Sequence, residues 1–140
     1  MNALRTASTL LAILFAGIVI AAPTRPAADA FGFGPRLSEK KLYRATLQPA
    51  APLKLRDLLT VPVLVVDADG KPVEGARISI DGGMPEHGHG LPTRPRMGRA
   101  LGQGVYELEG LRFSMDGWWE LILTIDGPRG SDRVTFNLGL

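Results

Sequence analysis

Apolar and polar residues alternate along most of the chain beyond residue 40. The clearest run is residues 118–125 (WWELILTI), where every second side chain from Trp119 to Ile125 is apolar. This period of two is that of a β-strand, whose successive side chains point to opposite faces. Shorter runs cover residues 41–47, 73–81, 104–109 and 134–138. The residues that we expect in the core are Tyr43, Ile78, Ile80, Tyr106, Leu108, Trp119, Leu121, Leu123 and Phe136.

Residues 58–66 (LLTVPVLVV) add a β-branched run that also predicts a strand. Pro62 lies within it and has no backbone N–H to donate, which favours an edge position or a β-bulge. Turn-forming residues separate the strands. Residues 67–72 (DADGKP) predict a reversal of the chain, and residues 126–131 (DGPRGS) predict a hairpin turn.

The pattern therefore predicts about seven short strands and no sustained helix. Strands that bury one face and expose the other need a second sheet to cover the buried face. The chain has 140 residues, enough for one such domain. We predict an all-β fold, an antiparallel β-sandwich over residues 40–140, preceded by a Gly-rich linker or loosely docked arm over residues 31–39.

Residues 1–30 have the pattern of an export signal. Residues 7–22 are uncharged and mostly apolar, and they follow a short segment whose single charge is Arg5. The small-x-small triplet that ends at Ala30 fits a cleavage site, which makes Phe31 the first mature residue. The alternatives are an uncleaved membrane-anchor helix and a buried core helix. We expect a periplasmic or otherwise exported protein, which contacts the membrane only if this segment is uncleaved.

Composition and charge exclude several kinds of site. The chain has no cysteine, which rules out disulfides, thiolate metal sites and a cysteine nucleophile. Its formal net charge is +2, from 16 basic and 14 acidic residues; without Arg5, Arg25 and Asp29 of residues 1–30, 14 basic and 13 acidic residues remain. This balance predicts no nucleic-acid partner. We find no nucleophile elbow and no phosphate-binding loop, so we expect no enzymatic activity.

Residues 82–98 (GGMPEHGHGLPTRPRMG) contain five Gly and three Pro, and we predict a long loop without regular structure. Long loops in compact domains are often functional. Arg94, Arg96 and Arg99 form a small basic cluster at its end. This cluster is either a solvated rim or an attraction for an acidic envelope protein.

The only two histidines of the chain, His87 and His89, lie two residues apart in this loop. In an extended segment such residues point to one side with Cα atoms about 6.6 Å apart, so both imidazoles can bind one metal ion. Met84 is the first candidate for a third ligand, and Met97 and Met115 are further candidates from neighbouring loops. Thioether with imidazole suits Cu(I), whereas imidazole with oxygen suits Cu(II). The alternatives are histidines that bond to the backbone, or a loop that docks on a protein.

Three stretches resemble the YtkA-like and FixH-like exported domains: VVDADGKPVEGARISI, GGMPEHGHGLPT and GVYELEGLRFSMDGWWEL, within residues 61–125. The resemblance implies an immunoglobulin-like sandwich that is exported or tethered to the membrane. It also implies a role in copper supply or in the assembly of respiratory oxidases. If that role applies here, the positions to test are Met84, His87, His89, Met97 and Met115.

Two functions follow from these observations. The first is an exported, non-enzymatic domain that binds copper through the loop of Met84, His87 and His89. The alternative is an envelope protein-binding or assembly module in which residues 82–98 form the docking surface and bind no metal.

Overall fold

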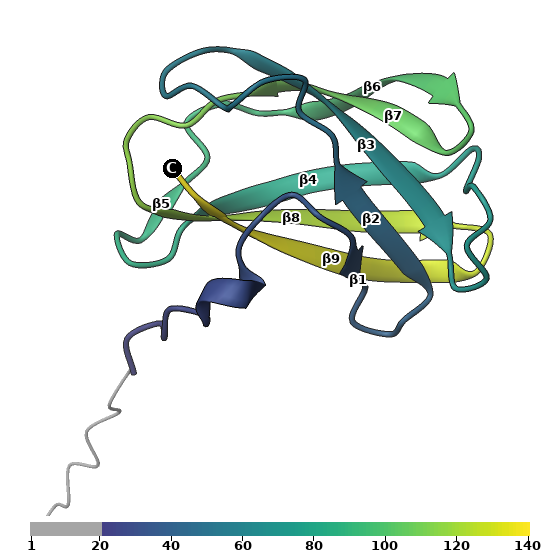
Figure 1. The fold of residues 1–140 in the computed structure, drawn as a ribbon, viewed down its shortest axis with the longest axis horizontal. Coiled ribbons are helices and arrows are strands. Elements are labelled where there is room, and N and C mark those ends of the chain that lie inside the picture. Colours follow the sequence, from purple (N-terminus) through teal and green to yellow (C-terminus); the bar gives the residue numbers. More distant parts are fainter. Residues whose placement is uncertain (1–20) are drawn as a thin grey trace, which may run out of the picture.

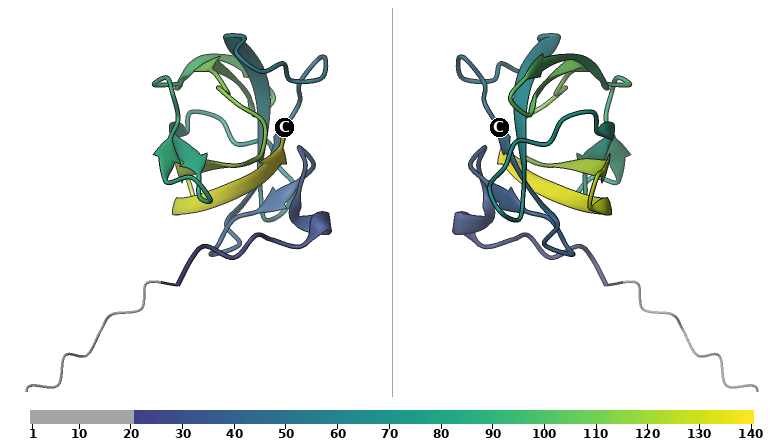
Figure 2. Two further views of the ribbon diagram at one scale, coloured as in Figure 1. Left: turned by 90° about the vertical axis from the view of Figure 1, so that its left-hand side faces the viewer. Right: turned by 90° about the vertical axis from the view of Figure 1, so that its right-hand side faces the viewer.

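The structure, a computed structural model, describes residues 21–140. These residues form two sheets that face each other as separate layers (Figures 1 and 2). One sheet has the strand order β1-β2-β3-β7-β6 and the other has the order β5-β4-β8-β9. The strands are β1 (Arg36–Leu37), β2 (Tyr43–Leu47), β3 (Leu59–Asp67), β4 (Arg77–Met84), β5 (His89–Gly90), β6 (Arg96–Gly102), β7 (Val105–Leu111), β8 (Trp118–Gly127) and β9 (Gly130–Gly139).

This arrangement is the topology of an immunoglobulin-like sandwich. Immunoglobulin constant domains place their first, second, fifth and fourth strands in one sheet, and their third, sixth and seventh in the other. The seven longer strands reproduce this order as β2-β3-β7-β6 and β4-β8-β9, and all named neighbours pair antiparallel. The predicted fold class and number of main strands are confirmed; β1 and β5 add two residues each.

The core lies between the two sheets. Of the nine side chains expected there, eight are buried, and Ile80 is half-buried against them. In β8 the inward set from Trp119 to Ile125 is fully buried, as a period of two requires. Buried side chains of β3 face it from the other sheet, namely Val61, Val63 and Val65.

Trp118 is buried although the alternation in β8 places it on the outer face of its sheet. Residues 31–39 cover Trp118, because this segment packs against the outer face of the sandwich. The Phe31 ring packs edge-on against Trp118 with centroids 6.5 Å apart, and Gly32 donates its N–H to the Asn137 carbonyl at 2.9 Å. Leu47 of β2 donates its N–H to the carbonyl of Phe33. The segment that we expected to be a linker or a loosely docked arm therefore contacts both sheets.

Pro62 lies in the middle of a sheet, because β3 pairs with β2 on one side and with β7 on the other. The expectation of an edge position is wrong for a simple reason. The last β2–β3 pair is Leu47 with Val63, and the Pro62 carbonyl accepts the Gln48 N–H just beyond it. The missing N–H of Pro62 thus falls past the end of β2, where little of the ladder is lost.

The prediction that residues 82–98 contain no regular element is wrong. Strand β4 continues to Met84, β5 follows, and β6 begins at Arg96. The glycines here permit close strand pairing. A Cβ at Gly82 would overlap the Glu120 carbonyl oxygen of β8, and one at Gly83 would overlap the carbonyl oxygen of His89 in β5.

Strand β6 forms one edge of the first sheet, and this edge is irregular. Strand β6 pairs with β7 with register shifts between Met97 and Ala100 and between Ala100 and Gly102. Most of its side chains are exposed.

The predicted signal or anchor segment, residues 7–22, lies almost wholly outside the described residues. Residues 21–27 have no regular structure, and a 3-10 turn follows at Ala28–Ala30. Within residues 21–140, no helix has the length and apolar character needed to cross a membrane. The export signal stays a prediction.

Candidate metal centre

The histidine pair lies on a tight hairpin at one end of the sandwich. Strands β4 and β5 pair Gly83 with Gly90 and Met84 with His89. The N–H of His87 donates to the Met84 carbonyl at 3.1 Å and closes the turn. Gly88 has a φ of 64°, in the left-handed region that glycine adopts without strain. The local sequence thus places both histidines at the tip of the hairpin.

The two imidazoles lie close together and face solvent. Their centroids are 5.8 Å apart, their planes are tilted by 35°, and both residues are exposed. A metal bound at about 2.0 Å to each ring lies about 3.2 Å from each centroid, so the centroids are about 4.5–6.4 Å apart for bond angles of about 90–180°. The observed separation falls within this range. The two rings thus lie at a spacing that a shared metal ion would allow, and the metal site itself stays a prediction.

Met84 is a core residue, only 1% exposed. It continues the inward-facing positions of β4 after Ile78 and Ile80, and its methyl group packs against Gly117, where a Cβ would lie 2.8 Å from it. Its Cα is paired with that of His89, but its thioether is covered by the core. The arrangement favours a packing role for this methionine.

Of the other two candidate methionines, Met97 lies away from the hairpin, whereas Met115 lies two residues before Gly117, which packs against Met84. Met97 is opposite Leu108 in the other sheet, and it lines a hollow with Ile78, near the start of β4. The hairpin is at the far end of β4, six residues and about 20 Å further along the strand. Met115 lies in the loop between β7 and β8, where its side chain is exposed and its carbonyl accepts the Trp119 indole N–H at 3.1 Å. The structure therefore does not bring Met97 to the histidines.

Oxygen donors lie nearer to the pair. Glu86 directly precedes His87 and is exposed. Asp81 and Glu120 line a hollow of about 340 Å³ together with His89. Among residues 21–140, no three His, Asp or Glu side chains are grouped tightly enough to hold a metal ion by themselves. The pair can thus offer a metal two nitrogen ligands and needs a further donor or water.

A comparison with family models matches residues 38–124 to the family described as YtkA-like. The chain belongs to the YtkA-like family. The matched region of this YtkA-like domain runs from just before β2 into β8 and includes the whole β4–β5 hairpin. Searches of curated proteins and of solved structures gave no significant match.

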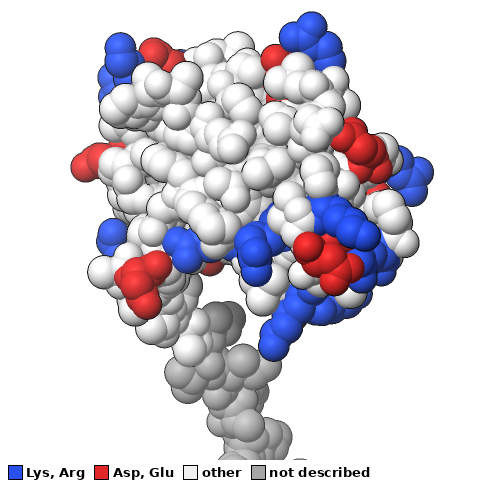
Figure 3. Space-filling model, turned by 45° about the vertical axis from the view of Figure 1, so that its right-hand side comes forward, with Lys and Arg blue, Asp and Glu red and all other residues white. Residues whose placement is uncertain are grey.

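The arginine cluster of the YtkA-like domain is largely paired with acidic residues. Arg96 contacts Glu109 at 2.8 Å, and Arg99 contacts Glu107 at 3.4 Å, both across the β6–β7 pair. In the view of Figure 3, basic and acidic side chains likewise lie beside one another around the rim. Because the pairs cancel most of the local charge, the cluster gives little support to an acidic docking partner.

Proposed function

We propose that this chain is an exported, non-enzymatic domain that binds copper through His87 and His89. One observation carries the proposal: the two imidazoles are exposed and spaced as ligands of a common metal ion. Export is supported by the apolar residues 7–22 and the small-x-small triplet before Phe31.

The available donors favour copper in its oxidised form. The chain has no cysteine, and the Met84 thioether is buried, which leaves Met115 as the one exposed thioether among the candidate ligands. Imidazole with carboxylate or water oxygen suits Cu(II) better than Cu(I). We therefore expect the chain to compete with chelators more successfully for Cu(II) than for Cu(I).

The test is titration of the purified chain with Cu(II) and Cu(I) against chelators of known affinity. Replacing either histidine, His87→Ala or His89→Ala, is expected to weaken Cu(II) binding at least about tenfold, because each removes one of two nitrogen ligands. The double variant is expected to lose the site.

Met97→Leu is the control, because Met97 lies far from the hairpin and leucine has a similar volume. Its Cu(II) affinity should equal that of the wild type. Equal copper binding by the wild type and the double histidine variant would refute this proposal.

A further inference from the structure

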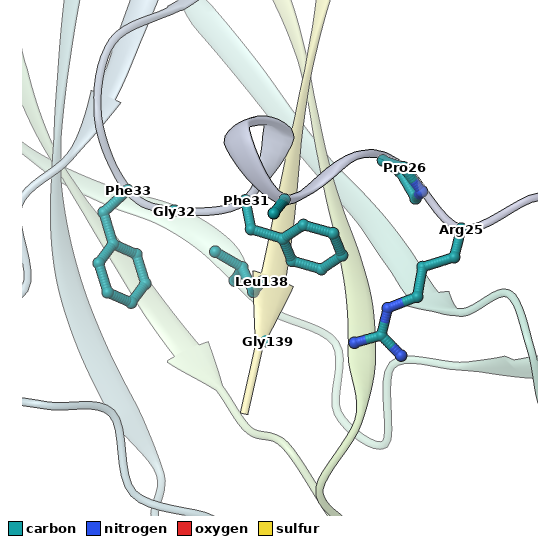
Figure 4. A pocket seen from close by; sticks show the side chains of 8 residues that line it. Arg25, Pro26, Phe31, Gly32, Phe33, Leu138 and Gly139 are labelled. Atoms are coloured by element: carbon teal, nitrogen blue, oxygen red, sulfur yellow. The ribbon is translucent and has the colours of Figure 1, made fainter.

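An arginine of the N-terminal segment reaches the candidate metal centre. The Arg25 guanidinium lies 3.6 Å from the Glu86 carboxylate and 5.4 Å from the centroid of the Phe31 ring. Figure 4 shows this arginine beside Phe31, and both residues line one pocket. The pocket has a volume of about 490 Å³.

The segment that carries Arg25 is anchored along β9. Phe31 packs on Trp118, and it forms a parallel bridge with Asn137. The Asn137 side chain also donates to the Ala30 carbonyl at 3.4 Å. These contacts fix the chain within a few residues of Arg25, so the arginine is held near Glu86.

Glu86 directly precedes His87 and is exposed, so it is a candidate for the further oxygen donor that the two imidazoles need, but in this structure its carboxylate lies against Arg25. We propose that Arg25 and a metal ion on the histidine pair compete for the Glu86 carboxylate, so that the N-terminal segment lowers the affinity of the site. This inference rests on the proposed function. The arginine acts in two ways: it occupies the carboxylate, and its charge repels the incoming cation.

The competition links the site to processing of the chain. Cleavage after Ala30, the predicted processing site, removes Arg25 and frees Glu86. The precursor then binds metal more weakly than the mature domain. The N-terminal segment thus lowers the metal affinity of the site until it is cleaved off.

The test is Cu(II) titration of the full-length chain in detergent, with Arg25→Gln, Glu86→Gln and the double variant. An exposed ion pair has a modest strength, so Arg25→Gln is expected to tighten Cu(II) binding about two- to fivefold. Glu86→Gln is expected to weaken binding and to abolish the effect of Arg25→Gln. The gain should shrink in high salt, which screens exposed charges.

Arg112→Gln is the matched control. Arg112 is an exposed arginine in the β7–β8 loop, and it has no ion pair within residues 21–140. Its replacement should leave Cu(II) binding unchanged. An equal gain in this control, or a gain from Arg25→Gln that persists with Glu86→Gln, would show a general charge effect and overturn the inference.

The two proposals fail in different ways. If no variant binds Cu(II) in a histidine-dependent manner, the proposed function fails and the competition fails with it. If binding depends on His87 and His89 but is the same with and without Arg25, only the competition is refuted.

Discussion

Gly82→Ala is expected to lower the free energy of unfolding by about 3–4 kcal/mol. Gly82 lies in β4 opposite Leu121 of β8, and its φ of 153° is one that side chains rarely adopt. An added Cβ would also overlap the Glu120 carbonyl oxygen. Because that oxygen belongs to the backbone of a central strand, β4 and β8 would have to separate. Urea denaturation followed by tryptophan fluorescence would measure the loss.

Gly34→Ala is the control for this substitution. Gly34 is exposed, has no positive φ, and a Cβ there would meet no atom within 4 Å. Its unfolding midpoint should match that of the wild type or rise slightly. A Gly82→Ala variant as stable as the Gly34→Ala variant would contradict the close packing of β4 against β8.

Asp132→Asn is expected to cost about 2–3 kcal/mol at pH 7. Asp132 is 4% exposed, and its carboxylate accepts the backbone N–H groups of Lys40, Leu42 and Arg133 at 2.8–3.2 Å. An asparagine would turn an N–H₂ group toward some of these donors. The loss would appear as a lower unfolding midpoint in urea.

The Asp132 carboxylate also makes the free energy of unfolding depend on pH. Burial raises the pKa of Asp132, but hydrogen bonds from the Ser38 hydroxyl and from three backbone N–H groups outweigh this and lower the pKa from 3.8 to about 2. The stabilisation is therefore complete above about pH 4 and is lost as the pH falls toward 2.

The free energy of unfolding, measured at several pH values, should fall less in this range for Asp132→Asn than for the wild type. Asp126→Asn is the matched control, because Asp126 is exposed at the end of β8. It should keep the pH dependence of the wild type. If the stability of Asp132→Asn still falls steeply in acid, the pH dependence belongs to other groups.

The strands were predictable because each buries one face and alternates accordingly. Residues 118–125 show this most clearly, and their inward set is fully buried. Trp118 is buried although the alternation places it on the outer face, and the periodicity of β8 alone cannot predict this. A distant segment covers it through Phe31, and that segment had the composition of a linker.

The candidate site was only partly predictable. The two-residue spacing of His87 and His89 suggested an extended segment, whereas His87 lies in a turn beside Gly88 at a φ of 64°; the imidazole centroids are nevertheless 5.8 Å apart. Met84 was misplaced because the glycines before it suggested a loop; continuing the alternation of Ile78 and Ile80 through β4 would have placed it in the core. Arg25 had no signal at all, because its segment was assigned to export and its ion pair with Glu86 depends on the fold.

The irregular edge of the first sheet has a consequence for how copies of this domain behave in solution. An exposed edge strand is a template on which a second molecule can add its own strand, which leads to aggregation. The register shifts along β6 interrupt the regular spacing of donors and acceptors, and Arg96 and Arg99 line the same edge. A neighbouring molecule therefore cannot extend this sheet without meeting gaps in the ladder and displacing charged side chains, which helps to keep the domain from polymerising.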